Sequence, residues 1–327
     1  MTYLALVVSE QFGKFIQEVK SLNTSNLPQG NVLIQVHYSS LNYKDALSAI
    51  GNKGVTKNYP HTPGIDASGI VVESDSRHIK VGEKVIVSGY DLGMNTPGGY
   101  GQYIRVPAEW VVKLPENLSL KEAMIIGTAG FTAGISITRL SELVKPDAGK
   151  IIVSGATGGV GSIALSILSK LGYKTVAVSG KEEEFPFLES LGAKEIISRN
   201  DFLGLDKKPI LSSTYAGGID TVGGPILENI IKTLNPLGAV TTCGSVSSTE
   251  LNLSVFPFIL RGISLIGISA QNYPMELRTK LWQKLAVEWK PDDLLKIHNE
   301  ITLNDLPEAI SLILKGKLKG RTIVQLQ

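Results

Sequence analysis

The sequence predicts an α/β protein in which a doubly wound parallel sheet is joined to a β-rich domain. Residues 1–120 hold alternating apolar and polar stretches broken by Gly and Pro, a pattern typical of strands and turns. Residues 150–268 instead alternate short apolar strands with helical segments, which indicates a parallel sheet. The chain closes with one isolated strand, "RTIVQLQ" (321–327), which fits the N-terminal β region better than the α/β series.

Length and composition exclude several classes of protein. A chain of 327 residues fits two domains, and with 43% hydrophobic and 19% charged residues it can bury a large core. The formal charge of +2 without a long basic run argues against a general nucleic-acid binder. No apolar stretch is expected to reach the roughly 18 residues of a membrane span, so we expect a cytoplasmic protein. The single cysteine, Cys243, excludes a disulfide within one chain.

The second half of the chain is expected to contain six strands separated by helices. A helix over 119–143 precedes them, with Ser119 and Glu122 as a capping box. The expected strands are 150–154, 174–179, 195–198, 218–222, 239–243 and 264–268. The expected helices are 159–171, 182–191 and 225–234, and the 199–217 connection is the least regular. Two further helical stretches follow residue 268.

The stretch "GATGGVGSIA" (155–164) lies between the first of these strands and an amphipathic helix. It matches G-x-G-x-x-G with Ala156 in place of the first glycine, in the strand–turn–helix setting that a dinucleotide fingerprint requires. Gly158 allows the backbone to approach a pyrophosphate, and Gly161 allows the helix to pack closely. Thr157, Gly158, Gly159 and Val160 are therefore candidate cofactor contacts, and the alternative is a tight turn without a ligand.

The next strand favours NADPH over NADH. NAD sites usually place Asp or Glu at its end to bind the ribose 2′-hydroxyl, whereas this strand ends in Ser179, Gly180 and Lys181. A hydroxyl and a cation suit a 2′-phosphate, and Arg199 after the third strand is a second candidate for it. The alternatives are an exposed lysine and a surface arginine, with one of the acids at 182–184 on the ribose.

Beyond these motifs, the chain resembles the medium-chain dehydrogenase/reductase superfamily over essentially its full length. The stretches that carry the resemblance are "SSLNYKDAL", "PGIDASGIVVES", "VGEKVI", "GGYGQYIRV", "GTAGFTA", "VSGATGGVG", "LGAKEII", "DTVGG" and "GRTIVQL". Their combination is similar to the YhdH/YhfP-type branch of zinc-free quinone oxidoreductases and acrylyl-CoA reductases. The resemblance implies a GroES-like catalytic domain (1–122 and 269–327), a Rossmann NADP-binding domain (123–268), use of NADPH and a homodimer.

The same resemblance argues against zinc. The positions of the catalytic zinc ligands in metal-dependent members are taken by Asn42, Ile65 and Ala129, none of which is a good zinc ligand. The cysteines of the structural zinc are also missing, and the four histidines show no ligand spacing. We therefore expect a zinc-independent site.

A metal-free site needs hydrogen-bond donors for the charge that develops on a carbonyl oxygen. The candidate catalytic residues follow the strand "VLIQVHYSS": Asn42, Tyr43 and Asp45. Asn42 is a candidate donor to the substrate or to the nicotinamide ribose, and Tyr43 offers a phenol. Lys44 and Asp45 are candidates for a local ion pair. The alternatives are that Tyr43 packs and Asp45 caps the following helix.

The family also implies cofactor contacts outside the glycine loop. Thr128 opens the segment that lies on the nicotinamide side, and Gly244 and Ser245 follow the fifth strand. Arg321 at the entry of the last strand suits a phosphate. Arg278 is a candidate for a CoA phosphate, although a charge on the helix surface is the simpler interpretation. The remaining alternative for Arg321 is also a surface charge.

These features favour an NADPH-dependent reductase of an activated C=C bond, with acrylyl-CoA, another short enoyl thioester or an enone as substrate. The alternatives are a quinone reductase and a non-catalytic NADPH-binding redox sensor. Neither a nucleic acid nor a membrane is expected as a partner. A homodimer is expected to use the apolar 250–268 region, where an edge strand is free to pair across a two-fold axis.

Overall fold

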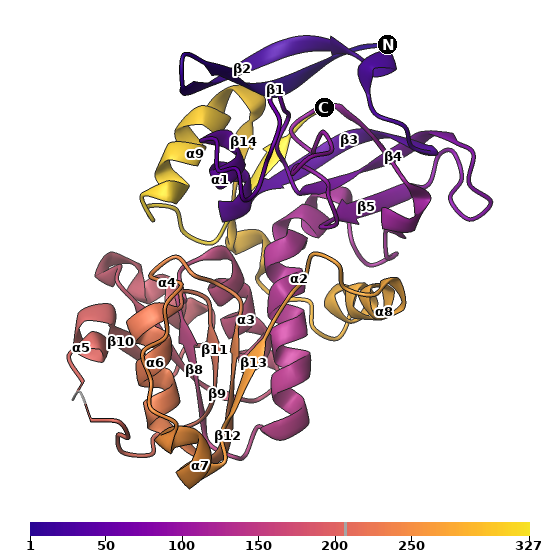
Figure 1. Cartoon of the computed structure of the whole chain (residues 1–327). Helices are drawn as coiled ribbons and strands as arrows, with labels where there is room; N and C mark the ends of the chain where they lie inside the picture. Colours follow the sequence, from indigo (N-terminus) through magenta and orange to yellow (C-terminus); the bar gives the residue numbers. More distant parts are fainter. Residues whose placement is uncertain (206–207) are drawn as a thin grey trace. The chain divides into compact units, whose positions relative to one another are not determined.

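The computed structural model describes residues 1–205 and 208–327 (Figure 1). The chain forms two compact units: residues 1–128, 271–287 and 294–327 make unit 1, and residues 129–270 and 288–293 make unit 2. Asp206 and Lys207, in the connection that the sequence leaves irregular, lie outside the described residues. The assignment of a catalytic and an NADP-binding domain to residues 1–122 with 269–327 and to 123–268 stays a prediction.

Unit 1 is built on a seven-stranded sheet with the order β14-β15-β3-β4-β5-β7, in which β6 also pairs with β3. Its strands are β3 (Val32–Leu41), β4 (Asp66–Ser74), β5 (Lys84–Ser88), β6 (Tyr103–Val106), β7 (Val111–Lys113), β14 (His298–Thr302) and β15 (Arg321–Gln325). A separate antiparallel hairpin is formed by β1 (Thr2–Gln11) and β2 (Lys14–Asn23). Helices α1 (Tyr43–Ala49), α8 (Met275–Ala286) and α9 (Leu306–Leu314) complete the unit. The buried core under the sheet includes Leu6, Val36, Ile104 and Leu306.

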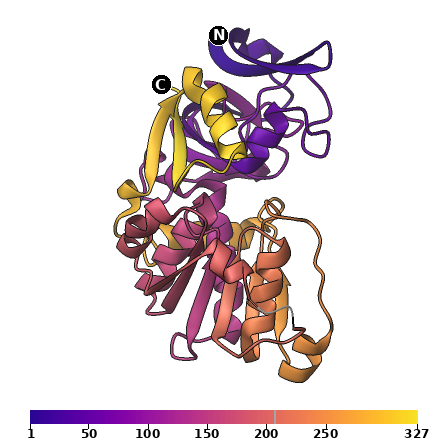
Figure 2. The ribbon, with the colours of Figure 1, turned by 90° about the vertical axis from the view of Figure 1, so that its left-hand side faces the viewer.

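The C-terminal strand joins the N-terminal sheet, as the sequence predicts. β15 runs antiparallel to β3, with Thr322 opposite Leu41 and Val324 opposite Ser39, and the yellow C-terminal segment lies beside the indigo and purple strands in two views (Figures 1 and 2). Strand β14 was not predicted. It is an edge strand that pairs only with β15, and its residues lack the alternation of apolar and polar side chains that marks a half-buried strand.

Unit 2 contains a six-stranded parallel sheet with the order β10-β9-β8-β11-β12-β13. Numbered from the first strand of the unit, this is the order 3-2-1-4-5-6 of a doubly wound dinucleotide-binding fold. The strands are β8 (Lys150–Ser154), β9 (Lys174–Ser179), β10 (Glu195–Ser198), β11 (Tyr215–Asp220), β12 (Leu234–Thr242) and β13 (Ser264–Gly267). The first three agree residue for residue with the prediction, and the predicted fold class is confirmed. Ligands bind such sheets at the carboxyl ends of the strands where the order reverses, here between β8 and β11.

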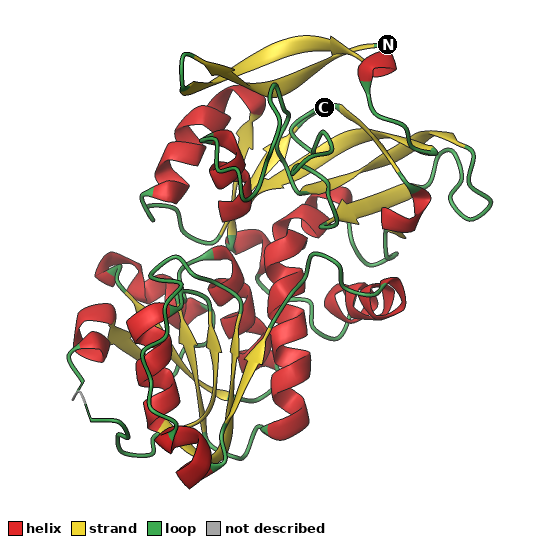
Figure 3. Cartoon of the chain, in the orientation of Figure 1, coloured by secondary structure: helices red, strands yellow, loops and turns green. Residues whose placement is uncertain are grey.

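Helices flank this sheet (Figure 3). They are α3 (Gly159–Lys170), α4 (Phe185–Ser190), α5 (Arg199–Leu203), α6 (Gly224–Thr233) and α7 (Phe256–Arg261). One helix was predicted over 182–191, but the chain forms a 3-10 turn over 182–184 and then α4. The α-helix begins only at Phe185, because Pro186 is tolerated only in the first turn of a helix.

Helix α2 (Leu120–Leu143) is kinked at Gly127, whose φ of 49° and ψ of −160° are not helical. The predicted capping box precedes it: the Ser119 N–H donates to Glu122 Oε2 over 2.8 Å, and the Glu122 N–H donates to Ser119 Oγ over 3.1 Å. By length and composition alone, α2 is apolar enough to cross a membrane, so the expectation that no stretch reaches that length is wrong. Because 83% of its apolar window is buried inside the protein, it has the environment of a core helix.

Candidate active site

The loop after β3 is fixed by a carboxylate. Asn42 is the N-cap of α1, and its backbone N–H donates to Asp45 Oδ2 over 2.9 Å. The other oxygen, Oδ1, accepts the Ile65 N–H over 2.8 Å. Asp45 thus satisfies two buried backbone donors and fastens α1 to the segment that precedes β4. The alternative prediction, that Asp45 caps the helix that follows the loop, is therefore confirmed.

The expected Lys44–Asp45 ion pair is wrong. Consecutive residues of a helix point about 100° apart, so the two side chains diverge. Lys44 Nζ instead donates to Gln271 Oε1 over 3.0 Å, while the Asp45 carboxylate is buried.

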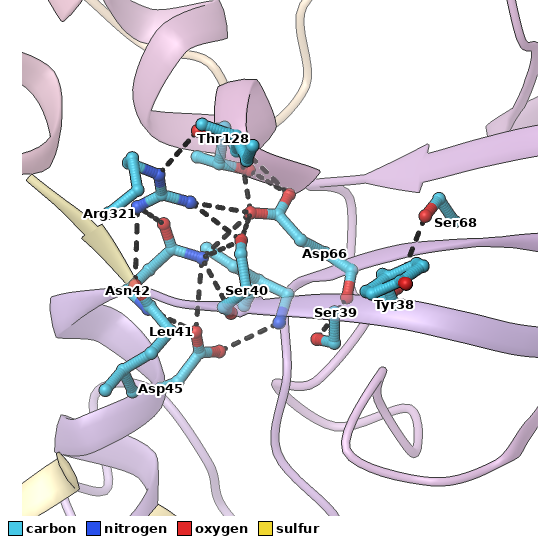
Figure 4. A network of polar contacts seen from close by, with 12 residues as sticks. Tyr38, Ser39, Ser40, Leu41, Asn42, Asp45, Asp66, Ser68, Thr128 and Arg321 are labelled. Atoms are coloured by element: carbon cyan, nitrogen blue, oxygen red, sulfur yellow. Dashed lines mark hydrogen bonds and ion pairs between the residues drawn. The ribbon is translucent and has the colours of Figure 1, made fainter. Parts of the chain in front are cut away.

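Asp66 lies at the centre of a buried polar network (Figure 4). Its Oδ2 accepts from Ser40 Oγ at 2.6 Å and from Asn42 Nδ2 at 2.9 Å. Thr128 donates to the same carboxylate twice, through its N–H (2.9 Å to Oδ2) and through Oγ1 (2.7 Å to Oδ1). These contacts join three segments of unit 1 that are far apart in the sequence.

The kink at Gly127 creates the contact with Thr128. A continuous helix would direct the Thr128 N–H to the carbonyl of residue 124, whereas the break leaves it free to donate to Asp66. The carboxylate then stands at the N-terminus of the second helical segment, where negative charge is favourable. A Cβ on Gly127 would lie 2.7 Å from Arg321 Nη2 and 2.8 Å from Asp66 Oδ2, so the network also needs the missing side chain.

Arg321 closes the network from β15 and is only 2% exposed. Its Nε donates to the Ile125 carbonyl over 2.9 Å, a carbonyl near the kink, and Nη2 donates to Ser40 Oγ over 2.8 Å. Nη1 donates to Asn42 Oδ1 over 3.2 Å, and Nη2 lies 3.9 Å from Asp66 Oδ2. The surface-charge alternative for Arg321 is excluded by this burial.

The side-chain amide of Asn42 is saturated by these contacts. Its Nδ2 donates to Asp66 Oδ2 and, over 3.2 Å, to Asp45 Oδ2, and its Oδ1 accepts from Arg321. An amide has two N–H donors, so this arrangement leaves none for a substrate. By contrast, the half-buried Tyr43 makes no hydrogen bond through its hydroxyl within the described part of unit 1. Of the predicted catalytic residues, Tyr43 is the available donor.

Burial and a neighbouring charge shift the pKa of Asp45. Burial, reinforced by the charge of Asp66, raises the pKa of Asp45 to about 7, although its hydrogen bonds act in the opposite direction. Burial lowers the pKa of Arg321, partly offset by the two carboxylates, and burial with the nearby carboxylates raises the pKa of Tyr100. The raised pKa brings the titration of Asp45 close to neutral pH.

In unit 2 the glycine loop has the geometry of a phosphate cradle. Gly158 precedes α3, whose first N–H groups have no acceptor within the helix. A Cβ on Gly161 would lie 2.4 Å from the Gly155 carbonyl oxygen, so only glycine permits the close packing that the sequence predicts. Thr157 Oγ1 lies 3.4 Å from Ser179 Oγ, which places the loop beside the end of β9.

A cationic side chain lies at the end of β9. The exposed Arg199 guanidinium packs over Gly180: a Cβ built on Gly180 would lie 2.7 Å from Arg199 Cζ. The Lys181 N–H donates to Ser179 Oγ over 3.1 Å. The structure thus brings together Ser179, Lys181 and Arg199, and the described residues offer Arg199 no carboxylate partner.

Asp220 joins the carboxyl ends of three strands. This buried residue accepts from Ser154 Oγ of β8 at 2.7 Å, from Thr242 Oγ1 of β12 at 2.8 Å and from the Gly223 N–H at 3.0 Å. Burial raises its pKa, against the effect of these hydrogen bonds. Asp220 therefore fixes the edge of the sheet at its switch point.

The predicted residues after β12 lie at this edge. A Cβ on Gly244 would lie 1.9 Å from the Thr221 carbonyl oxygen, so the loop after β12 rests directly on the loop after β11. Ser245 follows, with its Cα 3.3 Å from a Cβ built on Gly223.

Other predicted residues have structural surroundings. Arg278 is neither a surface charge nor free for phosphate: it is 1% exposed, donates to the Ser88 carbonyl over 2.8 Å and lies 4.7 Å from the Tyr90 ring. Phe131 is buried. Burial raises the pKa of Cys243 to about 12, consistent with an inert thiol.

Among the described residues, no group of three or more His, Cys, Asp or Glu side chains is placed to hold a metal ion.

Sequence reasoning missed Ser40, Asp66, Gly127 and Asp220. The available signal was the position of the two acids, since Asp66 opens and Asp220 closes a buried strand. A carboxylate at such a position must be hydrogen-bonded, so it marks a polar network. Gly127 gave a weaker signal, as one of several glycines within a helical pattern.

Known protein families and individual proteins are similar to this chain. Two family models match: the alcohol dehydrogenase GroES-like domain over residues 28–116 and the zinc-binding dehydrogenase over residues 159–287. The acrylyl-CoA reductase AcuI of Ruegeria pomeroyi is 40% identical over 323 residues, which cover 98% of each chain. YhfP of Bacillus subtilis, named for a quinone oxidoreductase activity, is 43% identical over 310 residues, 94% of each chain.

Solved structures agree. The YhdH oxidoreductase of Salmonella enterica in complex with NADP superposes with a TM-score of 0.96 at 39% identity, with all of each chain covered. The Bacillus subtilis YhfP structure with NAD bound has a TM-score of 0.96 at 41% identity, also with full coverage. The chain therefore belongs to the medium-chain dehydrogenase/reductase superfamily, in its zinc-free branch with YhdH, YhfP and AcuI.

Proposed function

We propose that this protein is an NADPH-dependent, zinc-independent oxidoreductase that reduces an activated C=C bond. The favoured substrates are acrylyl-CoA or a similar short enoyl thioester or enone, as the name of AcuI suggests. A quinone is the second candidate acceptor, because the name of YhfP points to it and it makes similar demands on a site. The other alternative is a non-catalytic NADPH-binding redox sensor.

The observation that carries the cofactor proposal is the set of groups at the end of β9. Gly180 stands where an NAD site commonly has an acid, and the missing side chain leaves room for the Arg199 guanidinium. With Ser179 and Lys181, this arrangement offers a hydroxyl and two cations to a ribose 2′-phosphate. The glycine loop would hold the pyrophosphate at the N-terminus of α3 through Thr157, Gly158, Gly159 and Val160. Gly244 and Ser245 would contact the cofactor at the neighbouring strand end.

When bound, NADPH would supply a hydride to the β-carbon of the activated C=C bond, and a proton from solvent would complete the reduction at the α-carbon. The chain's own residues would stabilise the negative charge that develops on the substrate carbonyl oxygen. We assign the donor role to the Tyr43 phenol, which has no partner within the described part of unit 1. Asn42 and Asp45 hold Tyr43 at the first turn of α1. Thr128 stays a proposed contact on the nicotinamide side, and Arg321 acts through its hydrogen bond to Asn42.

The test follows loss of NADPH absorbance with acrylyl-CoA, crotonyl-CoA, a simple enone and a benzoquinone, each repeated with NADH. We expect turnover with the enoyl thioesters and a higher kcat/KM with NADPH than with NADH. Arg199→Ala and Lys181→Ala should raise the KM for NADPH and leave that for NADH unchanged. Lys174→Ala is the matched control, because it removes an exposed lysine from the opposite end of β9.

Tight NADPH binding without turnover of any acceptor would refute the enzyme proposal. Faster turnover with NADH would refute the assignment of Ser179, Lys181 and Arg199 to a 2′-phosphate.

We further propose a cytoplasmic homodimer formed through residues 250–268, with no nucleic acid or membrane as a partner. β13 pairs on one side only, with β12, so its other edge is free in unit 2. Val255, Ile259 and Leu260 of the adjoining α7 region are each more than 60% exposed, and exposed apolar patches of this kind favour association. Light scattering should give twice the chain mass of 35.1 kDa, and Ile259→Glu should give monomers.

A further inference from the structure

Lys44, the second residue of α1, forms no ion pair with any of the described residues. We propose that Lys44 is the specificity-determining residue that pairs with a phosphate of a CoA thioester and so favours charged substrates over neutral enones and quinones. This inference rests on the proposed function as a reductase of activated double bonds.

The partner of Lys44 is a neutral side-chain amide. Lys44 Nζ donates to Gln271 Oε1 over 3.0 Å and makes no ion pair within the described part of the chain. The backbone carbonyl of Gln271, a different oxygen, accepts the Tyr90 N–H over 2.8 Å and Arg278 Nη2 over 3.1 Å, which fixes the main chain at this residue. The amide of Gln271 therefore orients the ammonium group and leaves its positive charge uncompensated.

The neighbouring acid in the sequence, Asp45, is engaged by other donors. Both oxygens of Asp45 accept hydrogen bonds from Asn42 and from the Ile65 N–H. Burial lowers the pKa of Lys44, with a smaller opposing effect from Asp45, so the half-buried ammonium is poorly solvated. An unpaired cation in such a place is stabilised by any anion that reaches it.

Other lysines of unit 1 have a different environment. Lys53, Lys113 and Lys121 form surface ion pairs with glutamates. Lys57 is exposed to water and has no acidic partner in the described chain. Lys44 combines burial with the lack of a counter-charge, and it directly follows Tyr43. The first turn of α1 thus presents a phenol suited to a carbonyl oxygen and a cation suited to an anion.

The test compares two thioesters with the same reacting group. Acrylyl-CoA carries phosphates, and the N-acetylcysteamine thioester of acrylate carries none. Lys44→Gln should raise the KM for acrylyl-CoA by about 10- to 100-fold, as expected for loss of one charge-assisted hydrogen bond. The kcat of Lys44→Gln with acrylyl-CoA should stay unchanged, and so should its kcat/KM with the uncharged thioester. Lys44→Arg should retain most of the affinity for acrylyl-CoA, and the matched control Lys57→Gln should behave like the natural protein.

A binding experiment separates this inference from the proposed reaction. Titration with unreactive propionyl-CoA, followed by calorimetry, should show at least tenfold weaker binding for Lys44→Gln than for Lys57→Gln. Lys44-dependent binding without any turnover would overturn the proposed function and leave the present inference standing. The inference would be overturned if Lys44→Gln lowered kcat/KM equally for both thioesters, or if it bound propionyl-CoA as tightly as Lys57→Gln does. Either result would leave the proposed NADPH-dependent reduction intact.

Discussion

Replacing Gly127 by alanine should destabilise unit 1 by far more than a typical surface substitution. The φ of 49° and ψ of −160° lie in a region that is essentially restricted to glycine, and a side chain there costs about 1–3 kcal/mol. The new Cβ would lie 2.7 Å from Arg321 Nη2, 2.8 Å from Asp66 Oδ2 and 2.9 Å from Ser40 Oγ. Moving a buried charged group off its partners costs a further 1–3 kcal/mol or so. We therefore expect a total loss of about 4 kcal/mol.

Gly82→Ala is the matched control. Gly82 has a φ of 85°, and a Cβ there would meet nothing within 4 Å, so this substitution tests the backbone contribution alone. Urea unfolding followed by circular dichroism should place the first transition of Gly127→Ala well below that of Gly82→Ala. Because a chain of two units need not unfold in one step, the first transitions are the ones to compare. Equal midpoints for the two variants would refute the claim that the network requires an empty space at residue 127.

Two further outcomes follow from the buried charges of unit 1. The raised pKa of Asp45, about 7 when folded against an ordinary 3.8, means that the folded protein holds this proton more tightly. The contribution of Asp45 to the free energy of unfolding should thus fall as pH rises from about 4 to 7 and then level off, by at most about 4 kcal/mol. Because Asp220 also has a raised pKa, Asp45→Asn should remove only this part of the pH dependence, and a profile identical to that of the natural protein would contradict the shift. Arg278→Met should lower the free energy of unfolding by about 2–4 kcal/mol through loss of the buried hydrogen bonds to Ser88. Urea unfolding should show a lower midpoint for Arg278→Met, and an unchanged midpoint would contradict this structural role.

The elements of unit 2 were largely predictable because their signals are local. A parallel strand buried on both faces reads as a continuous apolar run, and the glycine loop lies between two such clear elements. Boundaries failed where the signal is weak: β12 begins at Leu234 rather than Ala239, because Pro236 and Gly238 resemble a turn. Pro236 can occupy the strand only where its missing N–H is not needed.

The network of unit 1 was only half predictable. Asn42, Tyr43 and Asp45 lie together in sequence, and the family resemblance drew attention to them. Asp66, Gly127 and Arg321 come from distant segments that meet only through the pairing of β15 with β3 and β3 with β4. No local sequence pattern predicts contacts between such distant segments. The break at Gly127 is explained only by the folded structure, in which the Thr128 N–H donates to Asp66.

The structure also changes the chemistry that the sequence suggests for Asn42. From sequence, this residue replaces a metal ligand and faces the substrate as a donor. In the folded chain its amide lies between two carboxylates and a guanidinium, which use every donor it has and its acceptor as well. A group held in this way has little freedom to rotate toward a ligand without breaking charge-assisted hydrogen bonds. The network thus holds the first turn of α1, and the donor role that the sequence suggests for Asn42 passes, as a prediction, to Tyr43, whose hydroxyl has no partner in the described part of unit 1.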